Sequence, residues 1–165
     1  MAALRAQGTI VVVDTSGPAL MEASYAGADL VAPNREELAA VAGTDDFDAG
    51  IDALLAAGAG GVVATDGAAG LTVALRRSRC RARLESSVEP RNPTGAGDAA
   101  VASLAAHLAD AAPTAGDDAL VLARRAAAWS ASAVTMPLAG ELAPDHDAWA
   151  SRVVVTVART EPACP

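Results

Sequence analysis

Hydrophobic residues in this chain gather in short continuous runs. In the segments between these runs, apolar residues recur at the spacing of a helix. Residues 9–14 and 60–65 are rich in β-branched side chains, and such continuous runs are typical of strands buried on both faces of a parallel sheet. A shorter run covers 29–32. Helices are predicted between and around these strands, over 18–26, 34–41 and 47–57. Strands that alternate with helices predict an α/β fold.

The second half of the chain adds a hairpin and two longer helices. A tight turn at 66–70 precedes strands predicted at 71–77 and 80–84, and prolines interrupt the pattern at 90–93. Long helices are predicted from the glycines near 95 to 108 and from Asp117 or Asp118 to 134, followed by a short helix over 145–151 and a strand over 153–157. Residues 2–7 are interpreted as the last turn of a helix, as if the chain were cut out of something longer.

Composition excludes several classes of protein. With 52% hydrophobic and 19% charged residues and a mean hydropathy of +0.29, the chain is too apolar for a disordered segment. No apolar run reaches the roughly 18 residues of a membrane span, and the first residues lack the apolar core of a signal peptide. A cytoplasmic protein is therefore expected. The net charge of −8 argues against nucleic acid or an anionic membrane as the main partner.

All 12 basic residues are arginine, and five of them lie between 76 and 83. Because they alternate with Ser78, Cys80 and Ala82, this cluster is more simply the solvent-facing side of a strand than a phosphate-binding patch. Two cysteines, Cys80 and Cys164, are too few for a disulfide framework or a metal site. Both are expected to be free thiols.

The segment 92–98, Asn-Pro-Thr-Gly-Ala-Gly-Asp, carries the strongest chemical signal. Gly95 and Gly97 let the backbone turn tightly and approach a ligand, and the helix that starts there directs unpaired N–H groups toward one point. Asp98 stands beside this anion site, as a base that activates a hydroxyl would. The alternative is a glycine-rich helix start with an aspartate as partner of the helix dipole.

Two more segments follow predicted strands. Asn34 and Glu37 present an amide and a carboxylate on one helix face, which suits a hydrated Mg²⁺, although an ordinary N-cap explains the pair as well. Thr65 with Gly67 and Gly70 offers a hydroxyl and a flexible turn for a phosphate or ribose, or is simply a hairpin turn. Ligands of open α/β sheets bind at the carboxyl ends of strands, where all three segments are expected.

These motifs together resemble the PfkB-type, ribokinase-like carbohydrate kinases. The matching segments occur in the expected order at 14–20, 33–38, 65–70, 92–98 and 137–141. They look closest to the 1-phosphofructokinase and tagatose-6-phosphate kinase branch. The resemblance covers essentially the whole chain, 1–165, as the C-terminal, nucleotide-binding portion of such a domain. It implies a ribokinase-like α/β fold with a mostly parallel sheet covered by helices, without the N-terminal half and its lid.

The resemblance also implies roles for individual residues. Asp98 matches the catalytic base that takes the proton from a sugar hydroxyl. Backbone amides match an anion hole at Gly95, Ala96 and Gly97. Side chains that position Mg²⁺ and the ATP phosphates are matched by Asn34 and Glu37, and the ATP-contacting loop is matched by Thr65, Gly67 and Gly70. The segment 127–140 would form a wall of the adenine pocket.

Two departures from the family pattern bear on function. Ala32 stands where this branch commonly has lysine, which removes a cation near the ATP phosphates. The N-terminal half, with the sugar-binding motif, has no counterpart here. The resemblance therefore implies an ATP- and Mg²⁺-dependent phosphotransferase acting on a sugar or sugar phosphate, here its ATP-binding, catalytic-base half. The alternative is a truncated, inactive remnant or a half-domain that needs a partner, either a second copy or the missing half.

Overall fold

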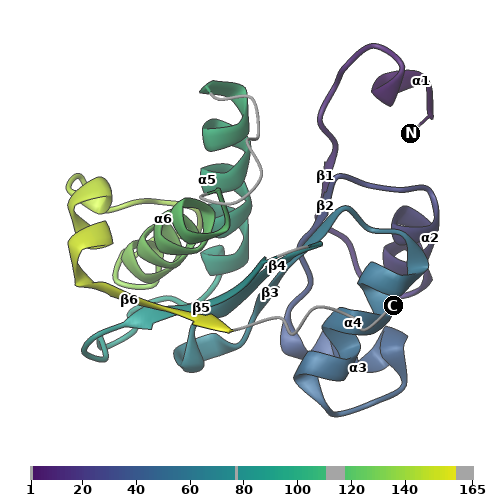
Figure 1. Ribbon diagram of the computed structural model, residues 1–165. Coiled ribbons are helices and arrows are strands. Elements are labelled where there is room, and N and C mark those ends of the chain that lie inside the picture. Colours follow the sequence, from purple (N-terminus) through teal and green to yellow (C-terminus); the bar gives the residue numbers. More distant parts are fainter. Residues whose placement is uncertain (1, 77, 111–117, 159–165) are drawn as a thin grey trace.

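The computed structural model describes residues 2–76, 78–110 and 118–158 (Figure 1). Arg77, Asp117 and Cys164, which figured in the expectations above, lie outside these residues. The α-helices are α1 (Ala2–Arg5), α2 (Pro18–Tyr25), α3 (Arg35–Ala42), α4 (Phe47–Ala57), α5 (Ala96–Asp110) and α6 (Asp118–Ala133). The 3₁₀ helices are η1 (Gly67–Ala69) and η2 (His146–Arg152). No helix in the described ranges combines the length and apolarity that a membrane span needs.

The strands form one mixed sheet. They are β1 (Val12–Val13), β2 (Leu30–Val31), β3 (Gly61–Thr65), β4 (Leu71–Leu75), β5 (Ser78–Leu84) and β6 (Val153–Ala158), in the order β1-β2-β3-β4-β5-β6. The first three run parallel, because helices connect each strand to the next. The remaining neighbours are antiparallel. The expectation of a mostly parallel sheet is therefore wrong: the link between β4 and β5 is far too short for a crossover, so they form a hairpin, and β6 returns beside it.

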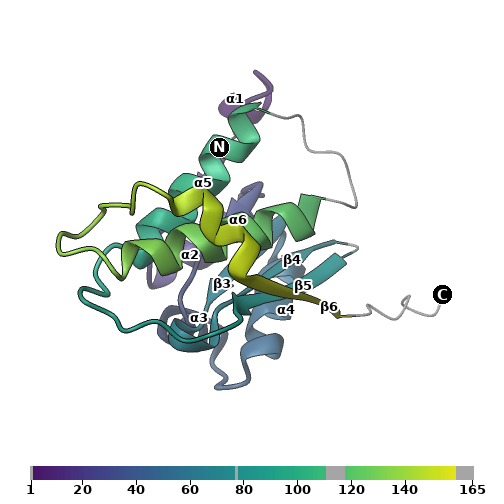
Figure 2. The same ribbon diagram turned by 90° about the vertical axis from the view of Figure 1, so that its left-hand side faces the viewer.

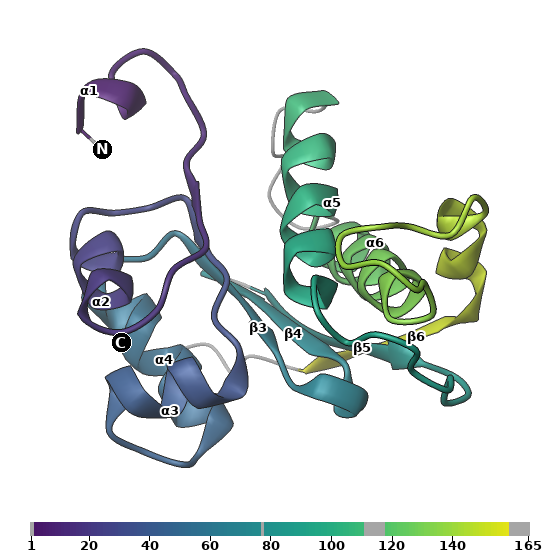
Figure 3. The same cartoon turned by 180° about the vertical axis from the view of Figure 1, so that it is seen from behind.

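Helices cover both faces of this sheet. Figures 1 and 3 show α5 and α6 on one face and α2, α3 and α4 on the other. Each face has its own hydrophobic core, one containing Val73 and Leu104 and the other containing Ile51 and Val62. The central strands β3 and β4 are buried along nearly their whole length. This double coverage is why their sequences are continuous apolar runs without alternation.

Successive side chains of strand β5 point alternately toward the helices on the two faces of the sheet. The strand runs beneath α6 (Figure 2). Its Cys80 and Ala82 are buried in the core, and burial raises the pKa of the Cys80 thiol. Arg79 and Arg81 form ion pairs with aspartates of α4, Arg79 with Asp52 and Arg81 with Asp48. The side chain of Arg79 is only 16% exposed. The interpretation of this cluster as a solvent-facing strand side is therefore wrong for Arg79, because α4 packs over that face.

Several elements differ in extent from the prediction. The strand predicted over 9–14 is limited to Val12–Val13, since β1 ends the sheet order and has a single described neighbour, β2. The turn at 66–70 contains the 3₁₀ helix η1, and the short helix near 145–151 is also of 3₁₀ type. The other predicted strands and helices are present within a few residues of their expected bounds.

Candidate functional site

The carboxyl ends of β1, β2 and β3 lie at one edge of the sheet because these strands are parallel. Asp14 follows β1 directly, Asn34 lies shortly after β2, and Thr65 ends β3. Asn34 and Thr65 pair as an isolated parallel bridge, and the Thr65 N–H donates to the Pro33 carbonyl at 3.0 Å. Polar side chains from three separate segments therefore meet at this edge.

The start of α5 is built into the same region. The Asn92 side chain shapes the turn: its Oδ1 accepts from the Thr94 N–H at 3.0 Å, and its Nδ2 donates to the Pro137 carbonyl at 3.3 Å. Gly95 has φ +88°, and a Cβ there would lie 2.5 Å from the Gly140 nitrogen. The turn before α5 is thus packed against the loop around Gly140 in a conformation that only glycine adopts without strain.

A pocket of about 190 Å³ lies where these segments meet. Its lining consists of Asp14, Ala32, Asn34, Glu37, Thr65, Gly95, Gly97 and Asp98. Six of these are residues that the sequence motifs singled out as site candidates. Segments separated by more than 60 residues along the chain thus contribute to one cavity, which sequence patterns could suggest but not place.

Three other candidates are not among the lining residues, namely Ala96, Gly67 and Gly70. The Ala96 N–H donates to the Pro93 carbonyl at 3.3 Å, inside the turn. Gly70 has φ +98°, and a Cβ there would overlap the carbonyl oxygen of Ala82 in β5. In this structure Gly70 therefore allows the close packing of its loop on the sheet.

Asn34 and Glu37 form a complete capping box at the start of α3. Asn34 Oδ1 accepts from the Glu37 N–H, and Glu37 Oε2 accepts from the Asn34 N–H, both at 2.9 Å. The N-cap interpretation therefore holds, and it is compatible with a ligand role. The capping box uses one oxygen of each side chain, so Glu37 Oε1 remains outside it, on a residue that lines the pocket.

Asp14 is the acidic residue at the pocket to which the sequence motifs had assigned no role. Its pKa is raised, first by burial and then by the negative charges of Asp98 and Glu37. Asp14, Glu37 and Asp98 are the ionisable residues that line the pocket, and all three are acidic. The sequence signal for Asp14 was its place as the carboxylate that ends a buried apolar run, but its proximity to Asp98 depends on the fold.

Replacing Asp14 by asparagine is expected to stabilise the folded chain at pH 7 by no more than about 0.5 kcal/mol, because it removes one of three neighbouring negative charges, and solvent screens the repulsion at a residue as exposed as Asp14. Since the folded-state pKa lies above the ordinary 3.8, the folded state binds more protons than the unfolded state just above that pH, and stability falls as pH rises through this window. The gain should therefore shrink as pH falls toward 4. Urea unfolding at several pH values measures it.

Asp45→Asn is a matched control for that measurement, because Asp45 is exposed in the loop before α4 and does not line the pocket. Equal stabilisation by both substitutions would attribute the gain to net charge and contradict the local explanation.

The donors at the pocket suit a hydrated Mg²⁺ better than a directly caged metal. Carboxylate, amide and hydroxyl oxygens are the ligands that Mg²⁺ prefers, and it usually keeps several waters. Among the described residues, no group of three or more His, Cys, Asp or Glu side chains is arranged to hold a metal ion. The carboxylate, amide and hydroxyl oxygens that line the pocket are therefore chemically compatible with a cation held through water.

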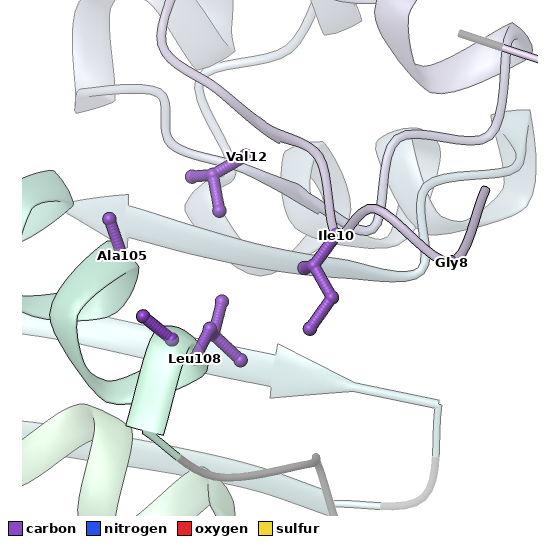
Figure 4. Close-up of a pocket in the computed structure, with 6 residues that line it drawn as sticks. Gly8, Ile10, Val12, Ala105 and Leu108 are labelled. Atoms are coloured by element: carbon purple, nitrogen blue, oxygen red, sulfur yellow. The ribbon is translucent and has the colours of Figure 1, made fainter. Parts of the chain in front are cut away.

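A larger cavity of about 480 Å³ lies between the β1 segment and α5 (Figure 4). Ile10, Val12 and Leu108 contribute apolar side chains to it, together with Gly8, Ala105 and Ala109. It presents no charged or hydrogen-bonding side chain, so it does not suit a phosphate. The smaller polar pocket is therefore the candidate site.

Comparison with known proteins gives the family and the fold of the chain. Residues 1–145 match the pfkB family of carbohydrate kinases. No curated protein sequence matches the chain. The fold is similar to that of a fructokinase from Vibrio cholerae O395, bound to fructose, ADP and calcium, with 29% identity and a TM-score of 0.77. This match covers 92% of the present chain and 53% of the fructokinase.

Two further solved structures have the same fold. Phosphofructokinase-2 from Escherichia coli, in complex with potassium, shares 26% identity with a TM-score of 0.78 over 92% of this chain and 50% of its own. Aminoimidazole riboside kinase from Salmonella enterica, at 20% identity, matches in fold with a TM-score of 0.75 over 89% and 54%. The chain thus spans about half the length of these proteins. It belongs to the pfkB family of carbohydrate kinases.

Proposed function

We propose that this chain is the nucleotide-binding, catalytic-base portion of an ATP-dependent kinase that phosphorylates a hydroxyl of a sugar or sugar phosphate. The observation that carries the proposal is the convergence of Asp98, Gly97, Asn34, Glu37 and Thr65 on one pocket. A carboxylate beside a helix N-terminus, with oxygen donors for a cation opposite, is the set of groups that phosphoryl transfer needs.

The size of the pocket supports binding of phosphate groups rather than a whole nucleotide. About 190 Å³ is less than the roughly 300–1,000 Å³ of pockets that enclose drug-sized ligands. The triphosphate end of ATP would lie here, and the nucleoside would extend along the neighbouring surface. The 137–140 loop packs against Gly95 and borders this region. It is the end of the segment 127–140 that is proposed to form a wall of the adenine site.

The proposed chemistry assigns separate tasks to the residues of the pocket. Asp98 accepts the proton of the sugar hydroxyl. The hydroxyl oxygen forms a bond to the γ-phosphorus, and the bond between that phosphorus and the oxygen that leaves with ADP breaks. N–H groups at the start of α5 stabilise negative charge on the transferred phosphoryl group. Mg²⁺, when bound, neutralises phosphate charge; Glu37, Asn34 and Asp14 are proposed to hold it through water. Ala32, where the branch commonly has lysine, adds no charge of its own.

Calorimetric titration of the chain with MgATP tests the nucleotide part of the proposal. We expect saturable binding with Mg²⁺ and at least tenfold weaker binding when EDTA removes it, because three carboxylates and the ATP phosphates repel one another without a cation. The Vibrio fructokinase structure, which holds ADP and calcium, supports this expectation. Absence of binding, with a native circular dichroism spectrum, would refute the proposal.

A second candidate function is that of a half-domain that acts only with a partner, or of an inactive remnant. Two observations favour it. The chain covers only 50% of the Escherichia coli phosphofructokinase-2 and 53% of the Vibrio fructokinase, and β1 lies at the edge of the described strands. The apolar cavity beside β1 would then be covered by the partner, a second copy or the other half of the domain. A single monomeric species in light scattering that also transfers phosphate to a sugar would exclude this candidate.

A further inference from the structure

Arg35 and Asp66 connect the two loops that carry the polar groups of the proposed phosphate pocket. Arg35 follows Asn34, and Asp66 follows Thr65. The guanidinium donates through Nε to Asp66 Oδ1 and through Nη2 to Asp66 Oδ2, the second at 2.6 Å. This two-pronged arrangement fixes the direction of both side chains as well as their distance.

An aromatic ring holds the guanidinium from a third element. The Arg35 Cζ lies 4.5 Å from the centre of the Phe47 ring at the start of α4. Stacking on an aromatic face together with a forked pair is a geometry that lysine cannot reproduce. Arg35 therefore ties the start of α3 to both the loop after β3 and the start of α4.

Besides this pair, few described contacts hold the two loops in register, and one of them is the bond from the Thr65 N–H to the Pro33 carbonyl. Strands β2 and β3 pair at a single described position, Val31 with Val62, before the Asn34–Thr65 bridge. Exposed ion pairs contribute little to overall stability, and the side chains of Arg35 and Asp66 are 47% and 25% exposed. The value of this pair therefore lies in the placement of its neighbours more than in the free energy of folding.

We propose that the Arg35–Asp66 pair is a positioning device that sets the distance between Asn34 and Thr65 and thereby the nucleotide affinity of the pocket. Neither residue lines the pocket, so the effect passes through Asn34 and Thr65. The inference rests on the proposed function for its binding consequence. The constraint on the loops, by contrast, exists without any ligand.

The test compares MgATP affinity in Asp66→Asn and Arg35→Lys with that of the unchanged chain. Both variants are expected to bind about tenfold more weakly, as for other supporting contacts around a binding site. A role for Arg35 as a mere positive charge predicts the opposite pattern. Arg35→Lys would then be neutral, and Asp66→Asn would bind the anionic nucleotide more tightly. Either of those results overturns the proposal.

Asp52→Asn provides the matched control, because it removes the exposed partner of another Arg–Asp pair, between α4 and β5 and away from the pocket, and leaves Arg79 paired with Asp48. Its MgATP affinity should equal that of the unchanged chain. Urea midpoints of all three variants are expected to remain close to that of the unchanged chain, which separates positioning from loss of fold.

Amide hydrogen exchange in the ligand-free protein separates failure of this inference from failure of the proposed function. Breaking the pair should speed exchange at the Thr65 and Asp66 amides, which donate to Pro33 and Gly70, and leave Val63 inside β3 unchanged. If the unchanged chain binds no MgATP, the proposed function fails, and exchange alone decides. Unaltered exchange at both amides in Asp66→Asn would then overturn the positioning role.

Discussion

Gly95→Ala is expected to destabilise the folded chain by about 2–4 kcal/mol. Gly95 has φ +88°, where a side chain introduces strain, and its Cβ would lie 2.5 Å from the backbone nitrogen of Gly140. The obstructing atom belongs to the backbone, so the clash is relieved only by moving the 137–140 loop. Urea denaturation followed by circular dichroism measures the loss.

Gly97→Ala is the matched control, since it changes another glycine of the same motif. A Cβ at Gly97 meets nothing within 4 Å, and the residue lies in the first turn of α5, where alanine is a good helix former. Stability should be unchanged or slightly higher. MgATP affinity should nevertheless fall on the order of 10–100-fold, because the methyl group projects where phosphate oxygens would approach the backbone.

These two variants give a sharp contrast because stability and binding move separately. Full stability in Gly95→Ala would show that the turn is not constrained by the Gly140 loop. Unchanged MgATP affinity in Gly97→Ala would show that the open space beside Gly97 is not the phosphate position.

Asp98→Asn is expected to lower the rate of phosphoryl transfer by about 10²–10⁴-fold, because the amide cannot accept the hydroxyl proton. Fructose 6-phosphate, fructose 1-phosphate and tagatose 6-phosphate are the acceptors to compare, with ADP release as the measurement. MgATP affinity should be retained, since the substitution removes a negative charge beside the phosphates. A measurable rate in the unchanged chain that Asp98→Asn leaves unaltered would exclude Asp98 as the base.

A second measurement on Asp98→Asn needs no activity. Burial and, after it, the charge of Asp98 raise the pKa of Asp14, so removal of that charge should lower the Asp14 pKa part of the way toward its ordinary value. An NMR titration of the Asp14 carboxyl group measures the change, with Asp45→Asn as a control that leaves Asp14 unaffected. An unchanged Asp14 pKa would show that the two carboxylates do not interact.

Local patterns were sufficient for the elements near the site. The capping preference of Asn34, followed by acidic residues in the first turn, predicted the start of α3, and the glycines at 95 and 97 predicted the start of α5. The run from 60 to 65 predicted a buried strand, because coverage on both faces requires apolar residues throughout. In each case the signal lies within a few residues.

The relative direction of neighbouring strands in the sheet was less predictable. Strands β1 to β3 follow the parallel expectation, since the helices between them allow crossovers. The hairpin of β4 and β5 was itself predicted, but its consequence, together with the return of β6, is a mixed sheet. Pairing between β5 and β6 joins residues more than 60 positions apart, for which no local pattern exists.

Sequence alone determined which segments form strands and which form helices, the acidic character of the chain, and the candidate residues Asn34, Thr65 and Asp98, since these depend on residue type and local spacing. The fold decided which of them share a cavity. It added Asp14 to the pocket, assigned Gly70 to packing against β5, and joined Arg35 to Asp66 across 31 residues. Such relations depend on distances between segments remote in sequence, and those distances are set only when the parallel strands align and the helices pack on both sides of them.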